Sequence, residues 1–243
     1  MKKTYFNIIL LGLTSMVLLA CKGELETEGI SRITYFPEFV LEGDELMVIS
    51  PGDPFTEPGV KALENGVELQ VESVVTGRFT GYKGSAIGTA SDEYTVTYSA
   101  VNQDGFPGSA TRTILAVNTG DFAPSIEGIY SSTTIRTTGE AYEGIRVLIW
   151  KTGPDTYEIS QGIGGFYGQG RNYGDGYIAR GATVAINDLG ANDFTFGQMQ
   201  FPVWGNTVDI TEMTIDVAAR TISYHVVADF GGQWDIVLTQ VQP

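Results

Sequence analysis

Hydrophobic and polar positions alternate along this chain in short runs with a period of two residues. In the clearest run, Tyr94, Val96 and Tyr98 alternate with threonine and serine, which is typical of a strand with one buried and one solvated face. Beyond the first 20 residues, no apolar stripe with helical spacing extends over ten positions. The chain is therefore predicted to be all-β. Similar runs occur at 46–49, 67–75, 93–101, 111–117, 146–150, 156–160, 182–186, 207–210, 221–227 and 234–238.

Glycine and proline interrupt this pattern once between two complete series of strands, at residues 118–125. We place a first domain at 31–118 and a second at 125–243, and both lengths suit antiparallel sandwiches or small barrels. The 31 glycines and the aromatic content of 11% agree with many tight turns between strands. The pattern leaves open whether the second domain is a barrel or a sandwich.

The first 21 residues have the parts of an export signal. Lys2 and Lys3 precede an apolar segment of about 15 residues, which is shorter than the roughly 20 needed to cross a bilayer as a helix. The segment ends in Leu-Leu-Ala-Cys at residues 18–21, which resembles a bacterial lipobox. This resemblance implies cleavage after residue 20 (signal peptide 1–20) and lipid attachment at Cys21, the only cysteine of the chain. An ordinary signal peptide followed by a chance cysteine is the alternative.

Residues 21–30 form a short acidic linker behind this cysteine, too polar to fold alone. The linker resembles the acidic stretch of Bacteroidota lipoproteins that are exported to the outer face of the outer membrane, and a plain solvated linker is the alternative. Cleavage removes two of the 14 basic residues and none of the 29 acidic ones, so 12 remain against 29 and the net charge becomes −17. Such a surface repels phosphate backbones, so no nucleic-acid partner is expected.

Two separated blocks of the first domain have a distinctive sequence pattern. The first is Gly-Asp-Pro-Phe-Thr-Glu-Pro-Gly-Val at 52–60, and the second combines Tyr-Thr-Val-Thr-Tyr at 94–98, Asp-Gly at 104–105 and Ala-Thr-Arg-Thr-Ile at 110–114. Together they resemble the Ig-like module of insecticidal crystal proteins and bacterial surface proteins. The resemblance implies an Ig-like β-sandwich. The segment 77–84 is longer than in the simple family form and gathers Arg78, Phe79, Tyr82 and Lys83, which makes it a candidate contact surface or a decorated hairpin.

The second domain is similar to the C-terminal β-domains of Bacteroidota surface lipoproteins encoded with nutrient-uptake systems. Gly-Ile-Tyr at 128–130, Gly-Gly-Phe-Tyr at 164–167 and Gly-Gly-Gln-Trp at 231–234 carry this similarity. It implies a lipocalin-like barrel or a related sandwich, together with a setting beside a SusC/SusD-like importer of the outer membrane.

Catalytic and metal motifs are scarce. His225 is the only histidine and is expected to point outward from its strand, so neither a multi-histidine metal site nor a convincing triad follows from the sequence. Asn and Asp near residues 172–175, 187–188 and 192–193 do not match a calcium-binding loop and suit turns equally well. No enzyme activity, cofactor or metal is expected.

Glycines and aromatic residues are concentrated at 162–177, which is the best candidate for a binding site. Flat rings and planar polar groups among glycines bind sugars or peptides, although glycine-aromatic strands also fill small barrels. The candidate ligand-binding residues are Phe166, Tyr167, Arg171, Asn172, Tyr173, Tyr177 and Trp204.

Two functions remain open at this point. The chain is interpreted as a lipid-anchored accessory subunit of an outer-membrane importer that binds glycan or peptide or braces the complex, and it is expected to face the cell exterior. The alternative is a structural or adhesive surface lipoprotein without a small-molecule ligand. A pocket or an exposed aromatic surface in the second domain favours the first, and a fully packed barrel favours the second.

Overall fold

The computed structural model of the protein describes residues 33–122 and 125–241. The predicted signal peptide, Cys21 and the acidic linker 21–30 lie outside the described residues. The chain divides into a unit that ends at Phe36 and a larger unit, Pro37–Pro243, to which all strands belong. No helix among the described residues is long and apolar enough to cross a membrane.

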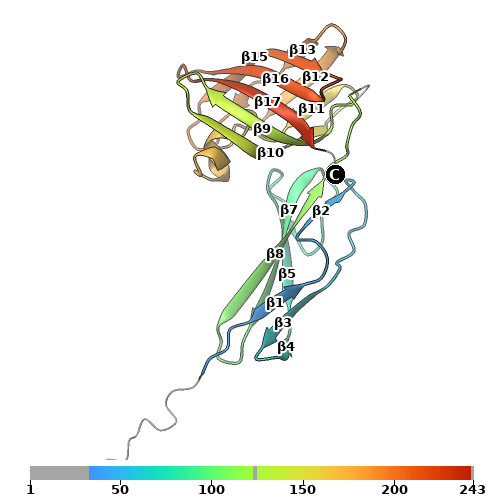
Figure 1. Cartoon of the computed structure of the whole chain (residues 1–243), viewed down its shortest axis with the longest axis vertical. Coiled ribbons are helices and arrows are strands. Elements are labelled where there is room, and N and C mark those ends of the chain that lie inside the picture. Colours follow the sequence, from blue (N-terminus) through green and yellow to red (C-terminus); the bar gives the residue numbers. More distant parts are fainter. Residues whose placement is uncertain (1–32, 123–124, 242–243) are drawn as a thin grey trace, which may run out of the picture. The chain divides into compact units, whose positions relative to one another are not determined.

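Two sheets form an Ig-like β-sandwich in the first half of the larger unit (Figure 1). A three-stranded antiparallel sheet has the order β1-β3-β4, and a five-stranded sheet has the order β2-β8-β7-β5-β6, in which β2 runs parallel to β8. The strands are β1 (Glu38–Leu41), β2 (Leu46–Ile49), β3 (Val60–Glu64), β4 (Val67–Leu69), β5 (Glu72–Gly77), β6 (Lys83–Gly84), β7 (Asp92–Val101) and β8 (Pro107–Ala116).

The inward face of β7 forms the centre of the sandwich core. Tyr94, Val96 and Tyr98 are buried, and residues of the opposite sheet such as Phe39 and Val60 pack against them. The alternation read from the sequence is thus confirmed in this strand. Gly105 adopts φ +86 in the turn between β7 and β8, a conformation that favours glycine and that the Asp-Gly pair predicts.

One antiparallel nine-stranded sheet makes up the second half, with the order β13-β12-β11-β10-β9-β17-β16-β15-β14 (Figure 1). Its strands and short turns are β9 (Gly128–Arg136), β10 (Ala141–Lys151), β11 (Thr156–Ile159), η1 (Phe166–Gly170), η2 (Asp175–Tyr177), β12 (Ala182–Asp188), β13 (Asp193–Phe196), β14 (Met199–Gln200), β15 (Thr207–Asp216), β16 (Thr221–Ala228) and β17 (Gln233–Val241). The predicted break at 118–125 falls between β8 and β9.

The nine-stranded sheet curls into a half-barrel. Just before β12, Arg180 exchanges two backbone hydrogen bonds of 3.0 Å with Gln200 of β14, which ties the two ends of the sheet together. The C-terminal half is thus barrel-like, and the sandwich that the sequence left open is not formed.

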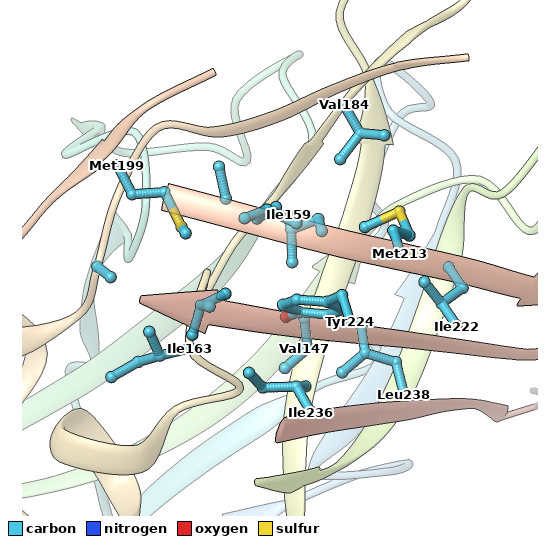
Figure 2. Close-up of a cluster of buried hydrophobic side chains, with 14 of the residues drawn as sticks. Val147, Ile159, Ile163, Val184, Met199, Met213, Ile222, Tyr224, Ile236 and Leu238 are labelled. Carbon is cyan, nitrogen blue, oxygen red and sulfur yellow. The ribbon is translucent and has the colours of Figure 1, made fainter. Parts of the chain in front are cut away.

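Side chains fill the concave side of this half-barrel. Figure 2 shows apolar residues of several strands gathered in one cluster, among them Val147 of β10, Tyr224 of β16 and Ile236 of β17, all nearly or fully buried. Trp234 of β17 is fully buried in the same cluster, as expected for a ring in mid-strand. The concave side of the half-barrel is therefore filled by a packed hydrophobic core.

Candidate functional site

Residues 160–181, between β11 and β12, hold most of the predicted binding residues. The segment lies close against the sheet because Gly164 and Gly165 adopt φ +64 and +82 and leave no room for a side chain. A Cβ on Gly164 would lie 2.5 Å from the hydroxyl of Ser132, and one on Gly165 would lie 2.5 Å from a methyl group of Ile145. These glycines therefore serve close packing of the segment.

The structure divides the seven candidate residues into two buried rings and five residues that are half-buried or exposed. Phe166 and Tyr167 are 0% and 4% exposed, and their rings contact each other and Trp234 edge to face. Burial raises the pKa of the Tyr167 hydroxyl, which keeps it neutral at ordinary pH. These two rings form the base of the site.

Three aromatic rings cover this base from the solvent side, and we call Tyr173, Tyr177 and Trp204 the aromatic platform. Tyr173 is 48% exposed and stacks on Tyr167 with ring centres 5.9 Å apart and an angle of 18°. Trp204 is 40% exposed, and its ring centre lies 4.8 Å from those of both Tyr167 and Tyr177. Because Tyr173 is also 5.4 Å from Tyr177, the three rings form one contiguous surface.

The turn at 201–206 brings Trp204 to residues that precede it by about 30 positions. The amide of Val203 donates to the carbonyl of Gly176 at 3.3 Å, and Gly205, with φ +74, donates to Phe201 at 2.8 Å. Val203 itself is 57% exposed beside Trp204. Val203 was not among the predicted binding residues, although its position between a proline and a loop tryptophan could have indicated an exposed residue of the site.

Arg171 lies at the edge of the site, above the buried rings. Its guanidinium carbon is 5.3 Å from the ring centres of both Phe166 and Tyr167, a cation–π arrangement. Its Nε donates to a carboxylate oxygen of Glu140 at 2.8 Å, and Tyr142 donates to the same oxygen at 2.7 Å. The hydrogen bond from Arg171, then that from Tyr142, lowers the pKa of Glu140 to about 2. Arg171 is thereby fixed in orientation.

Asn172 completes the set of candidate residues as an exposed turn residue. It adopts φ +56, in the left-handed region that asparagine tolerates better than most residues. Its backbone amide donates to the carbonyl of Gln169 at 3.0 Å, and this hydrogen bond closes the turn that carries the side chain. The structure thus places Asn172 next to Tyr173 at the rim of the platform.

The other residues that the sequence offered for catalysis or metal binding make contacts within strands and turns. His225 points away from the core, between the buried Tyr224 and Val226, and its Nδ1 lies 2.7 Å from Asp235. The Asn187 amide donates to Asp193, and Asn192 accepts from the amide of Ile215, as turn side chains commonly do. Within residues 33–122 and 125–241, no three histidine, cysteine or acidic residues are grouped as metal ligands.

The segment 77–84, a candidate contact surface, makes its contacts within the chain's own larger unit. Arg78 pairs with Glu93 at 3.1 Å and with Asp175 at 2.7 Å. Phe79 packs 6.0 Å from Trp150, and its carbonyl accepts a hydrogen bond of 2.9 Å from Arg180. Asp175 is the first residue of η2, which belongs to the candidate site, so this ion pair connects the segment 77–84 to the site.

Comparison with known proteins agrees with this architecture. Residues 119–240 match the model of a C-terminal domain family, and residues 39–115 match the bacterial surface protein Ig-like domain. Among solved structures, the lipoprotein BT2262 from Bacteroides thetaiotaomicron is similar at 29% identity and a TM-score of 0.63, covering 84% of this chain and all of that one. The chain therefore belongs to the family of this C-terminal domain and carries a bacterial surface Ig-like domain ahead of it, and its similarity to a Bacteroides lipoprotein agrees with a Bacteroidota surface lipoprotein.

Two further comparisons add no argument. A redesigned β-barrel matches at 10% identity and a TM-score of 0.34, covering 48% of this chain and 92% of that one. No curated protein matches the sequence. The matching families are described as Ig-like and C-terminal domains, and neither description names an enzymatic activity.

Proposed function

We propose that this protein is a lipid-anchored subunit on the outer face of the outer membrane that works beside a SusC/SusD-like nutrient importer. In this proposal, Cys21 carries the lipid, the linker 21–30 and the Ig-like domain hold the C-terminal domain away from the membrane, and the aromatic platform binds glycan or peptide. The role is binding and not catalysis. The similarity to a Bacteroides lipoprotein over its full length supports the surface setting.

The observation that carries the binding role is the exposure of the platform. Tyr173 and Trp204 remain 48% and 40% exposed while both contact the buried ring of Tyr167. Flat, partly exposed rings beside a fixed arginine and an asparagine suit the C–H faces and hydroxyls of a sugar. They equally suit the backbone and apolar side chains of an extended peptide. Both ligand classes therefore enter the test.

The test uses residues 21–243 with Cys21→Ala, so that the chain is soluble, and titrates it with maltoheptaose, an inulin oligosaccharide and a casein peptide digest. We expect saturable binding of at least one probe. In the combined Tyr173→Ala and Trp204→Ala variant, binding is expected to weaken at least tenfold, which corresponds to about 1.4 kcal/mol and matches the loss of stacked rings.

Phe106→Ala provides the matched control, because Phe106 is 46% exposed in the Ig-like domain and lies outside the platform. This variant is expected to bind as the unmodified chain does. Unchanged affinity in the platform variant, with its fold intact by circular dichroism, would place the ligand elsewhere.

A structural or adhesive role without a small ligand is the second candidate. The packing of the half-barrel favours it, because Phe166, Trp234 and their neighbours fill the space where lipocalin-like barrels hold ligands. Failure of all three probes to bind, combined with adhesion of the intact cells that depends on this protein, would favour this second role.

A further inference from the structure

The Ig-like sandwich contains a hollow of about 690 Å³. It lies between the two sheets, with Val60 of β3 on one side and Val75 and Val96 of β5 and β7 on the other. The loops at 50–59 and 85–89 form its rim. Protein interiors are close-packed and contain few voids larger than a water molecule, whereas a volume of several hundred Å³ is typical of small-molecule sites.

Small apolar side chains leave this space open. Four valines and Ile87 line the walls, and Phe55 lies on the rim loop. Val75 and Val96 are only 3% and 4% exposed and belong to the sandwich core. The hollow thus presents apolar walls at these positions, together with polar residues elsewhere in its lining.

A fixed carboxylate lies at the polar side of the hollow. The Oε1 of Glu57 forms an ion pair with Arg112 at 3.0 Å and accepts from the amide of Gly59 at 3.3 Å, and its Oε2 accepts from the Tyr98 hydroxyl. A carboxylate has about four acceptor positions, two on each oxygen, so Oε2 retains one for a further donor. The side chain of Glu57 is 32% exposed, so it is not fully enclosed by the protein.

The charges of the lining select against anions. Asp53 and Glu57 are the acidic side chains among the lining residues, which include no lysine, arginine or histidine. A ligand carboxylate or phosphate would be desolvated beside two acids without a cation to pair with. A hydroxyl or an ammonium group would instead donate to Glu57.

We propose that this hollow binds a small amphipathic molecule whose polar end is a hydrogen-bond donor, with its apolar part against the valines and its donor on Glu57. The site lies in the Ig-like domain and is independent of the aromatic platform. Alcohols and primary amines both have a polar end of this kind, and 1-octanol and octylamine distinguish the two classes.

The test titrates the soluble chain of residues 21–243 carrying Cys21→Ala with the uncharged fluorophore N-phenyl-1-naphthylamine. We expect saturable binding at a stoichiometry of one, and displacement by 1-octanol and by octylamine. Octanoate has the same chain length and an anionic end, so it is expected to displace the fluorophore at least tenfold more weakly. Displacement by octylamine but not by 1-octanol would show that the site binds cations. Displacement by both compounds would show that it binds hydrogen-bond donors with or without a charge.

Two neighbouring residues of β5 provide a matched pair of variants. Val75→Phe adds a ring inside the hollow and is expected to weaken binding at least tenfold. Val74 points to the opposite face and is 54% exposed, so Val74→Phe is expected to bind normally. Trp204→Ala is also expected to bind normally, which distinguishes this site from the platform.

Amide resonances of the unmodified chain give a second, independent readout that does not depend on a variant folding. Addition of 1-octanol is expected to shift the amides of Ser73, Val75 and Val96. Absence of saturable binding, shifts confined to the C-terminal domain, or full affinity in a folded Val75→Phe variant would each overturn the proposal.

Discussion

The guanidinium of Arg112 on β8 is completely buried, and its Nη2 lies 3.0 Å from a carboxylate oxygen of Glu57 in the loop between β2 and β3. The same guanidinium donates to the carbonyl of Glu42 at 2.8 Å. One buried cation therefore ties two loops to the five-stranded sheet. Both partners belong to the motif by which the sequence resembles Ig-like modules, so the pair gives a physical reason for those motif positions.

We predict that Glu57→Leu destabilises the Ig-like domain by about 3 kcal/mol, because it leaves a buried guanidinium without its counter-charge. Lys61→Ala is the control, since Lys61 and Glu42 form an exposed pair 3.8 Å apart, and its loss is expected to change stability by less than about 1 kcal/mol. Urea unfolding followed by the amide resonances of β7 and β8 measures both. Equal effects of the two variants would show that Arg112 does not depend on Glu57.

Two buried tyrosines of the half-barrel differ in one hydrogen bond. The hydroxyl of Tyr130 donates to the carbonyl of Ile126 at 2.6 Å, whereas the buried hydroxyl of Tyr224 has no hydrogen-bond partner among the residues that the structure describes. We predict that Tyr130→Phe destabilises the fold by about 1 kcal/mol and that Tyr224→Phe leaves stability unchanged or raises it, because it removes an unsatisfied polar group. Urea unfolding followed by tryptophan fluorescence reports on this domain, since all three tryptophans lie at 150, 204 and 234. A larger loss for Tyr224→Phe than for Tyr130→Phe would contradict the assignment.

The carboxyl of Glu140 is predicted to titrate with a pKa of about 2, well below its ordinary value of 4.5, because Arg171 and Tyr142 donate to its charged form. A pKa that is lower in the folded than in the unfolded state contributes stability above pH 4.5, and this contribution is lost as the pH falls toward 2. Carbon-13 resonances of the glutamate carboxyls measure the titration directly. In Arg171→Met, the pKa is expected to rise toward 4.5, and a titration that is unchanged in this variant would exclude Arg171 as the cause.

Alternation identified the long strands well, because a sheet with one buried face imposes it. The predicted run 93–101 is nearly the whole of β7, and 221–227 is nearly the whole of β16. The run 67–75 was predicted as one strand, but it divides into β4 and β5. Its two halves pair with different sheets, β4 with β3 and β5 with β7, and no glycine or proline marks the change.

The candidate site was predictable in composition and less so in geometry. The fold brings Tyr173, Tyr177 and Trp204 into contact, and the glycine-rich pattern drew attention to these rings. It could not separate them from Phe166 and Tyr167, because the left-handed turn at 164–165 decides which rings enter the core, and glycine alone does not specify the direction of a turn. The closure between Arg180 and Gln200 likewise depends on a backbone bridge that no side-chain pattern encodes.

The proposed lipid anchoring beside an importer is tested directly by co-purification of the intact protein. The tagged protein with its native Cys21 is extracted from its own outer membrane in a mild detergent, and mass spectrometry identifies what accompanies it. The Cys21→Ala variant serves as the control and is expected in the soluble fraction without partners. We predict that the native form recovers a TonB-dependent barrel and its lid lipoprotein. Recovery of the native form alone would contradict the importer setting. Retention of the Cys21→Ala variant in the membrane would contradict lipid anchoring at Cys21.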